Sequence, residues 1–288
     1  PVHMDKLAYG ADATVVVNRV KAHTAFRGQI ESGLCKMIAV GLGKQEGAEV
    51  MHSFGLAEAI PEAAKLVLEK ANIAFGVGLV ENAFHRTCRL AVVVPEEMHS
   101  SDAELLKLAN EHFPRVPFQE LDVLIVDWIG KNISGAGMDY NVIGMWRRLG
   151  GERVPNYERV VVLNLTPESH GNALGVGAAD MIPRTLYQQI DFAATYANVL
   201  TANALPVGKI PVVLQNDRGV IQEALRTSLP RGEPRMVRIR STLDLDEIYV
   251  SEGLLPEVEA NPRLKAMGEL ESLRFDGSGK LESVWERE

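Results

Sequence analysis

The first half of the chain alternates short apolar runs with longer segments of helical periodicity. Residues 15–17 are all valine and lie between polar positions, which is typical of a parallel strand covered on both faces. The closely spaced apolar residues of 34–43 predict a buried helix that ends at Gly41 or Gly43, because glycine commonly ends helices. Residues 56–72 carry alanine and leucine at helical spacing and predict a second helix.

The next segments predict a hairpin, a helix and a linker. Two apolar runs, residues 73–80 and 89–94, are typical of paired strands. The sequence Ser101-Asp102-Ala103-Glu104 matches a capping box and predicts a helix that starts there and runs to about His112. Residues 115–119 contain or follow two prolines and are the best candidate for a linker between domains.

The same alternation continues after this linker. It predicts strands at residues 121–128, 160–165 and 210–214, helices at 185–204 and 218–227, and a hairpin around Gly277-Ser278-Gly279. Strands that alternate with helices favour an α/β protein, here with two domains of mostly parallel sheets flanked by helices. We expect the domains at residues 1–119 and 120–288, with a ligand cleft between them.

Composition narrows the class of protein. Apolar residues make up 46% of the 288 residues and charged residues 24%, as in ordinary globular proteins. The net charge is -8 and no run of Lys or Arg occurs, so no nucleic-acid partner is expected. No segment has the ~18 consecutive apolar residues of a membrane span, so no membrane partner is expected either. Two cysteines, Cys35 and Cys88, cannot form a disulfide framework, and we expect a reduced, cytoplasmic protein.

Polar, glycine-rich loops follow several of the predicted strands. In open α/β sheets ligands bind beyond the carboxyl ends of strands, which singles out residues 18–33, 129–144 and 164–177. In the middle loop, Lys131 lies among glycines that allow a close approach to a ligand. A flexible surface loop would explain the glycines but not the apolar residues Ile129, Ile133 and Met138. We expect Asp127, Lys131 and Asp139 to line one cleft.

Three residues near the first loop have side chains suited to catalysis or metal binding. Lys36 lies in an otherwise apolar segment, where burial favours a neutral, nucleophilic amine, unless the side chain extends to the surface. His23 and His52 are suited to proton transfer and metal binding, but a hydrogen-bonded structural histidine is the more common situation. Neither Gly-Lys pair of the chain has the spacing of a phosphate-binding P-loop.

These residues resemble a motif of the nickel-pincer-nucleotide-dependent lactate racemase family. That family has a His after a strand, a Ser-Gly-x-x-Lys segment, and a His sixteen residues beyond the Lys. The corresponding residues are His23, Ser32-Gly33-Leu34-Cys35-Lys36 and His52, since Lys36 and His52 are sixteen positions apart. The segment from Gly130 to Asp139 is similar to sequence expected of a divergent branch of the family. The resemblance covers most of the chain.

The resemblance implies an isomerase that racemises or epimerises a small 2-hydroxy acid. Lys36 would hold the nickel pincer nucleotide (pyridinium-3-thioamide-5-thiocarboxylic acid mononucleotide) covalently, within a cofactor site that includes Ser32 and Gly33. His52 would bind Ni, and His23 would be the acid/base for the substrate hydroxyl while hydride passes from the substrate carbon to the cofactor and back. Lys131 would be the cation that contacts substrate, with Arg147 as its alternative.

The chain departs from the family pattern in three respects. The gap from His23 to Lys36 is longer than usual, the substrate-binding Tyr-Gln and Lys of the C-terminal domain have no clean counterpart, and an upstream segment with a second acid/base His is absent. Either the chain is a C-terminal portion of a longer protein, or racemase activity is lost. For a C-terminal portion we expect a first domain that lacks strands and leaves an open sheet edge or a half-formed cleft. We also expect it to lack racemase activity when isolated, since the second acid/base group is missing.

Two other functions stay open beside the racemase. One is a non-catalytic ligand-binding protein that keeps the fold, which would have no need of an amine at Lys36. The other is a different cofactor-dependent hydrolase or lyase that uses the loop from Gly130 to Asp139. The identity of the substrate and the oligomeric state are not encoded in any motif. For the racemase we expect His23, Lys36 and His52 to converge on one cleft.

Overall fold

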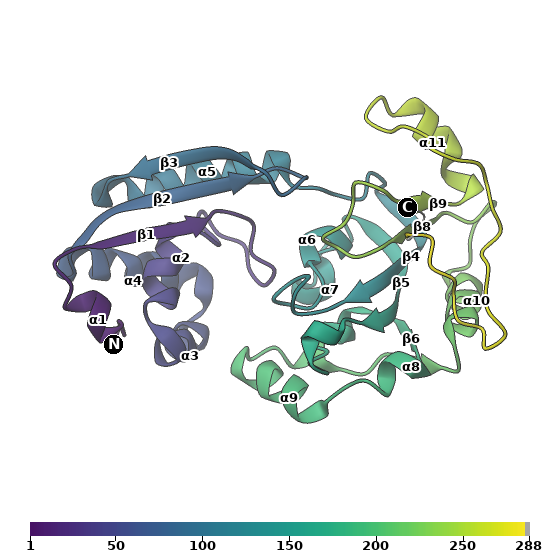
Figure 1. The fold of residues 1–288 in the computed structure, drawn as a ribbon, viewed down its shortest axis with the longest axis horizontal. Coiled ribbons are helices and arrows are strands. Elements are labelled where there is room, and N and C mark those ends of the chain that lie inside the picture. Colours follow the sequence, from purple (N-terminus) through teal and green to yellow (C-terminus); the bar gives the residue numbers. More distant parts are fainter. Residues whose placement is uncertain (286–288) are drawn as a thin grey trace. The chain divides into compact units, whose positions relative to one another are not determined.

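The structure is a computed structural model that describes residues 1–285 (Figure 1). The chain forms two compact units, Pro1–Pro114 and Arg115–Glu288, here called unit 1 and unit 2. Both are mixed α/β units, each with its own sheet and its own buried apolar core. The α/β class with mostly parallel sheets, expected from the alternation of patterns, is confirmed.

Unit 1 contains a three-stranded sheet in the order β1-β2-β3. Strand β1 pairs with β2 in parallel, and β2 pairs with β3 in the antiparallel direction. Its elements are α1 (Lys6–Tyr9), β1 (Thr14–Arg19), α2 (Leu34–Lys36), a π-helical turn (Met37–Gly41), α3 (Lys44–Phe54), α4 (Leu56–Lys70), β2 (Ile73–Glu81), β3 (Thr87–Val93), a 3-10 turn (Pro95–Glu97) and α5 (Met98–His112).

One face of this sheet packs on helices and the other is exposed. Gly76 and Gly78 of β2 let the helices approach closely, because a Cβ at Gly76 would lie 2.8 Å from the Met98 sulfur. On the opposite face Val15 is 45% exposed and Val17 is 56% exposed. The prediction that residues 15–17 are covered on both faces is therefore wrong, whereas the expected open sheet edge is present, at β1, among the strands of residues 1–285. Strand β1 pairs only with β2 among the described strands and is covered on one face.

Unit 2 contains a six-stranded sheet in the order β7-β6-β5-β4-β8-β9. All neighbouring strands are parallel except β9, which pairs with β8 in the antiparallel direction. Its main elements are β4 (Glu120–Ile129), α6 (Tyr140–Ile143), α7 (Trp146–Leu149), β5 (Asn156–Leu165), β6 (Met181–Pro183), α8 (Arg184–Tyr187), α9 (Phe192–Thr201), β7 (Val212–Leu214), α10 (Asp217–Ser228), β8 (Met236–Ile239), β9 (Tyr249–Val250) and α11 (Leu255–Ala260).

The central strands of unit 2 are apolar on both faces, as expected for a parallel sheet covered by helices. Val123 and Ile125 of β4 belong to a core that includes Val220 and Ile221 of α10. The predicted helix at 185–204 is wrong as a single element. It is broken into α8 and α9, and Asp191 accepts a hydrogen bond from the backbone N–H of Ala194 at the start of α9. Aspartate at such a position starts a helix, which the apolar spacing alone does not reveal.

The capping-box prediction is also wrong. Helix α5 begins at Met98, three residues before Ser101, so Asp102 lies inside the helix and not at its start. None of the helices in residues 1–285 combines the length and the apolar character that a membrane crossing requires.

Candidate functional site

The loop after β1 folds back on itself and places Ser32 beside the end of that strand. The backbones of Lys21 and Ser32 exchange two hydrogen bonds, of 2.8 and 3.2 Å. The Asn18 side chain donates a further hydrogen bond of 2.8 Å to the Gly33 carbonyl. The loop is therefore closed at its base, and His23 lies within it.

His23 is held by contacts inside this loop. Its backbone N–H donates to the buried Glu31 carboxylate at 2.6 Å, and its ring lies 4.5 Å from the Phe26 ring. The His23 Nδ1 accepts a hydrogen bond of 3.1 Å from the Ala25 backbone N–H. Since Nδ1 is an acceptor here, the proton of the neutral imidazole is on Nε2. His23 is thus arranged to donate a proton or hydrogen bond from Nε2.

A buried carboxylate from α5 fixes the start of α2. Asp102 is 2% exposed and accepts hydrogen bonds from the backbone N–H groups of Leu34 and Cys35, at 2.9 and 2.7 Å. A Cβ at Gly33 would lie 2.5 Å from the Asp102 carboxylate, so this contact requires glycine. Burial raises the pKa of Asp102, although the two N–H groups oppose that effect. Burial, with Asp102 nearby, also raises the pKa of the Cys35 thiol, which is therefore not a nucleophile.

Lys36 is the last residue of α2, and its side chain is partly buried. Within residues 1–285, no hydrogen bond or ion pair engages its ammonium group. Burial lowers the pKa of Lys36, and the positive charge of Lys21 lowers it further. A lysine without a counter-charge in such surroundings has a larger neutral fraction, and the neutral amine is the nucleophilic form.

His52 lies in the last turn of α3, which packs on the π-helical turn after Lys36. Its Nδ1 is 2.6 Å from the Ala48 carbonyl oxygen. A carbonyl can only accept, so Nδ1 carries the proton and donates it. This leaves Nε2 with the lone pair that a metal requires, in the arrangement typical of metal-binding histidines.

Four of the six predicted site residues share one closed loop or follow it directly: His23, Ser32, Gly33 and Lys36. No contact described in residues 1–285 joins His52 to Lys36 or His23. The convergence of the three side chains on one cleft therefore stays a prediction. The described part of the chain also has no group of three or more His, Cys, Asp or Glu residues arranged to hold a metal.

Lys131 lies in unit 2, directly after β4. Its ammonium donates hydrogen bonds to the Gly135 carbonyl at 2.6 Å and to the Asn198 side-chain oxygen at 2.8 Å. Its backbone N–H donates to the Ser169 hydroxyl at 2.9 Å. Burial lowers the pKa of Lys131, and no carboxylate contributes to its surroundings. Its role in contacting substrate stays a prediction.

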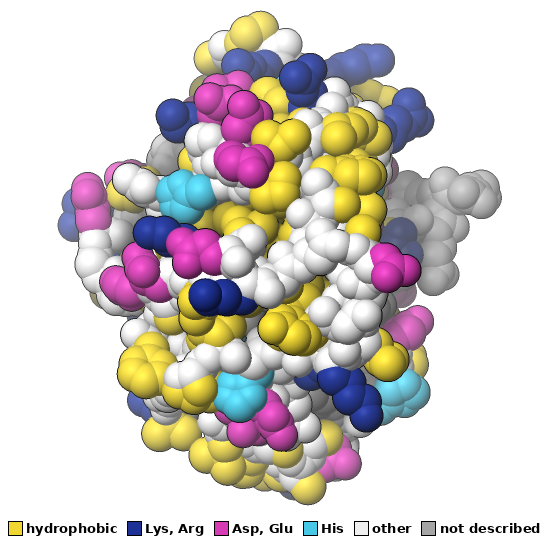
Figure 2. Space-filling model, turned by 90° about the vertical axis from the view of Figure 1, so that its left-hand side faces the viewer, with side chains coloured by type: hydrophobic (Ala, Val, Ile, Leu, Met, Phe, Trp, Pro, Cys, Tyr) yellow, Lys and Arg dark blue, Asp and Glu magenta, His cyan; other side chains and the backbone are white. Residues whose placement is uncertain are grey.

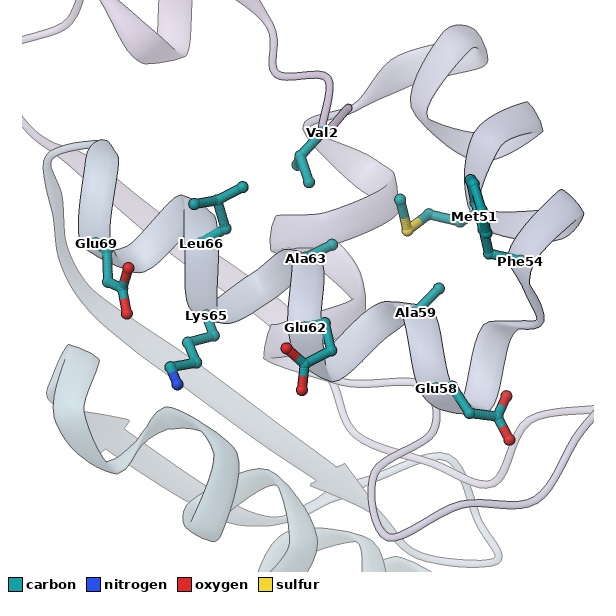
Figure 3. Close-up of a pocket in the computed structure, with 10 residues that line it drawn as sticks. All are labelled: Val2, Met51, Phe54, Glu58, Ala59, Glu62, Ala63, Lys65, Leu66 and Glu69. Atoms are coloured by element: carbon teal, nitrogen blue, oxygen red, sulfur yellow. The ribbon is translucent and has the colours of Figure 1, made fainter.

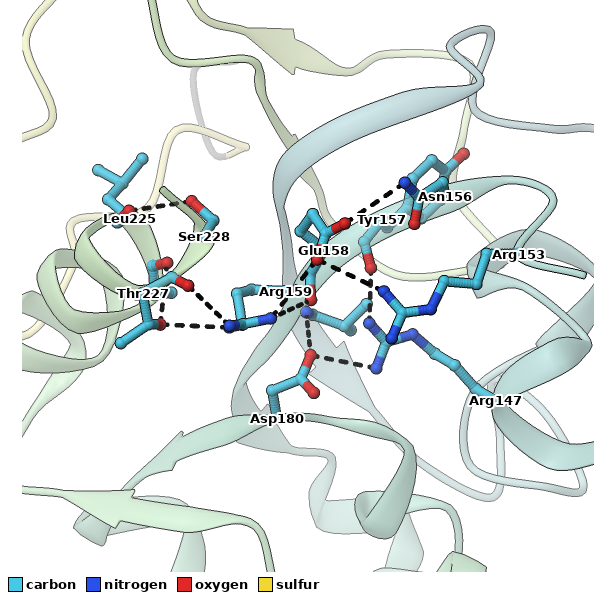
Figure 4. Close-up of polar contacts among 12 residues, drawn as sticks. Arg147, Arg153, Asn156, Tyr157, Glu158, Arg159, Asp180, Leu225, Thr227 and Ser228 are labelled. Carbon is cyan, nitrogen blue, oxygen red and sulfur yellow. Dashed lines mark hydrogen bonds and ion pairs between the residues drawn. The ribbon is translucent and has the colours of Figure 1, made fainter. Parts of the chain in front are cut away.

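Arg147 has a structural position instead of a ligand-facing one (Figure 4). Its side chain is 7% exposed and forms an ion pair of 3.1 Å with Asp180. It also donates hydrogen bonds to the backbone carbonyls of Ala178 and Tyr157, at 3.0 and 2.7 Å. The structure therefore gives no support to Arg147 as the alternative to Lys131.

The two aspartates expected beside Lys131 hold the fold together. Asp127 is 4% exposed and accepts hydrogen bonds from Arg238 at 2.7 Å and from the Trp285 indole at 2.7 Å. Asp139 caps α6 by accepting a hydrogen bond of 2.8 Å from the Asn141 backbone. The expectation that it lines a cleft is wrong for Asp127, because its carboxylate is buried against Arg238 and Trp285. These two partners are far away in the sequence, so no local pattern indicates them.

The comparisons with known proteins identify no family. No protein-family model matches the chain, and no curated protein matches its sequence. Among solved structures, the chain is similar to the lactate racemase apoprotein from Thermoanaerobacterium thermosaccharolyticum, with 14% sequence identity and a TM-score of 0.44. The similarity covers 84% of this chain and 64% of that one, so the chain spans less than two thirds of the length of that protein.

Proposed function

We propose that the chain is part of an isomerase that racemises or epimerises a 2-hydroxy acid with a nickel pincer nucleotide attached to Lys36. The observation that carries the proposal is the partly buried Lys36 amine, which has no acidic partner in residues 1–285 and lies directly after the Ser32-Gly33 turn. A protein that only kept the fold would gain nothing from such an amine, because an unpaired buried ammonium is costly.

The residues present fit the chemistry that this cofactor needs from a protein. The neutral amine favoured at Lys36 can form the covalent attachment, and Lys21 provides a positive charge nearby for an anionic group. The Nε2 of His52 suits nickel, because imidazole is a common ligand of that metal and the Ala48 carbonyl fixes the required tautomer. A single protein ligand is sufficient where the cofactor itself supplies the others. When bound, the cofactor would accept the substrate's hydride and return it.

The proton chemistry is assigned to His23. With Nδ1 accepting the Ala25 N–H, the neutral ring donates at Nε2, which is the role of a general acid toward a carbonyl oxygen. To take the hydroxyl proton of a 2-hydroxy acid, the neutral ring must accept it at Nδ1, so the hydrogen bond from the Ala25 N–H must first be released. Lys131, which has a positive charge and only neutral acceptors, is proposed to hold the substrate carboxylate.

The experiment is production of the chain together with the enzymes that make the cofactor, followed by intact-mass, peptide-mapping and nickel analysis. We expect one covalent adduct at Lys36 and about one nickel per chain, because a single lysine would hold a single cofactor with its metal. Lys36→Ala should lose the adduct, whereas Lys107→Ala, an exposed lysine of the same unit, should keep it. His52→Ala should keep the adduct and lose nickel.

Two results would overturn the proposal. One is a wild-type chain that acquires no adduct under conditions that load a known racemase in parallel. The other is an adduct that persists in Lys36→Ala. Interconversion of hydroxy-acid enantiomers is not a readout of this experiment, because the chain in isolation is expected to lack racemase activity.

A further inference from the structure

A surface groove of unit 1 lies between α4 and the residues that precede it. It has a volume of about 630 Å³, and its apolar lining comes from three segments. Figure 3 shows the side chains of Ala59, Ala63 and Leu66 on the side of α4 that faces Val2, Met51 and Phe54. Phe54 is 70% exposed and Leu66 is 42% exposed, whereas Met51 and Ala63 form the buried floor.

The groove has an acidic side. Glu58, Glu62 and Glu69 line it along α4, together with a single basic residue, Lys65. In Figure 3 these four charged side chains lie on the side of α4 away from the apolar stripe. No ion pair joins any of the four to another residue of the described chain. The face that Figure 2 views likewise shows exposed hydrophobic side chains next to carboxylates.

The dimensions of the groove fit a helix. Residues 58 and 69 are eleven positions apart on α4, which corresponds to roughly 16 Å or three helical turns. The small residues Ala59 and Ala63 leave room for another backbone to approach, and Phe54 and Leu66 offer larger apolar contacts on either side. Amphipathic helices bind such grooves through apolar residues three or four positions apart.

The charges indicate what kind of helix would bind. A second copy of this chain would bring the same three carboxylates against each other across a symmetric contact, because a two-fold interface uses the same surface twice. A helix with Lys or Arg beside its apolar stripe would instead place positive charge along the acidic side. We propose that this groove is the docking site for a basic amphipathic helix of a partner protein.

The test uses two fluorescent 18-residue amphipathic peptides with the same leucine stripe, one with lysine and one with glutamate on its polar face. Binding to the full chain is measured by fluorescence anisotropy. We expect the basic peptide to bind at least tenfold more tightly than the acidic one. Leu66→Asp should weaken its binding at least tenfold, and Glu58→Lys with Glu62→Lys should reverse the preference between the peptides.

A matched control variant shows that the effect is specific to the groove, and circular dichroism shows which variants are folded. Leu200→Asp, at a 67% exposed leucine of unit 2, should leave peptide binding unchanged. The charge-reversed variant changes only exposed residues, so it keeps the test valid even if Leu66→Asp fails to fold. Equal binding of the two peptides, or unchanged binding in the folded groove variants, would overturn the proposal. Concentration-dependent dimerisation that Leu66→Asp abolishes would also overturn it, since a second copy would then occupy the groove.

Discussion

The ammonium group of Lys36 is penalised by burial, and no carboxylate of the described chain offsets that penalty. The nearby positive charge of Lys21 acts in the same direction, so both effects lower the pKa of Lys36. The base of the loop holds Lys21 in place through its two backbone hydrogen bonds to Ser32. Lys21, whose charge lowers the pKa of Lys36, thus belongs to the same closed loop that ends at Ser32 and Gly33.

Replacement of Lys21 should change the reactivity of Lys36. Lys21→Gln removes one positive charge, so the pKa of Lys36 should rise and its neutral fraction at neutral pH should fall. Acetylation of Lys36 by limiting acetic anhydride, followed by mass spectrometry across a pH series, should then slow roughly twofold or more at neutral pH. Lys21→Arg keeps the charge and should behave like the wild type. An unchanged pH profile in Lys21→Gln would show that Lys21 does not tune the amine.

The contact between α5 and α2 is a link between two elements far apart in the sequence. Asp102 is buried and satisfies two N–H groups at the start of α2, and those groups have no other partner in the helix. Asp102→Ala should lower the free energy of unfolding of unit 1 by about 2 kcal/mol, because it leaves buried donors unsatisfied.

Glu104→Ala is the informative control. A capping box at Ser101 would make Glu104 a partner of the helix start, and its removal would then cost about 1 kcal/mol. In the structure Glu104 is an exposed residue inside α5, so we expect a change within about 0.5 kcal/mol. Urea denaturation followed by circular dichroism distinguishes the two. A larger loss in Glu104→Ala than in Asp102→Ala would contradict the structural assignment.

The local sequence pattern predicted most of the helices and strands, but not which groups the charged side chains contact. The hairpin of β2 and β3, the helix α10 and the parallel sheet follow from apolar periodicity and turn residues, which act over a few positions. The exposure of one face of β1 depends on which helices pack against the sheet, and three valines in a row do not encode that. Likewise Asp102 lies within a sequence that matches a capping box, but its carboxylate accepts hydrogen bonds from Leu34 and Cys35 of another helix.

In the candidate site, too, the local sequence identified residues, and the structure was needed to show their contacts. The spacing of Ser32, Gly33, Lys36 and His52 singled out the residues, and the structure adds the tautomers of the two histidines and the missing counter-charge of Lys36. The spacing could not separate Lys131 from Arg147, because only the folded sheet reveals that Arg147 is paired with Asp180.

The C-terminal segment of the chain completes the core of unit 2. Leu281 is buried against α10 and β4, and its backbone N–H donates to the Asp217 carboxylate at 2.8 Å. Four residues later, the Trp285 indole donates to Asp127, which is also paired with Arg238. The two side chains of that pair are each 6% exposed. The last described residues therefore cover a buried ion pair formed by strands β4 and β8.

Removal of one member of this pair should be much more costly than removal of both. Asp127→Leu leaves the Arg238 charge buried without its partner, which typically costs about 3–5 kcal/mol, and Arg238→Met leaves Asp127 in the same state. The double variant buries no charge and should recover most of that loss, since apolar residues of similar size often replace buried ion pairs at little cost. The free energies of unfolding of the four proteins, from urea titrations, give the coupling between the two residues. Additive losses in the double variant would mean that the pair contributes no coupling, and that Trp285 and the C-terminal segment stabilise each residue separately.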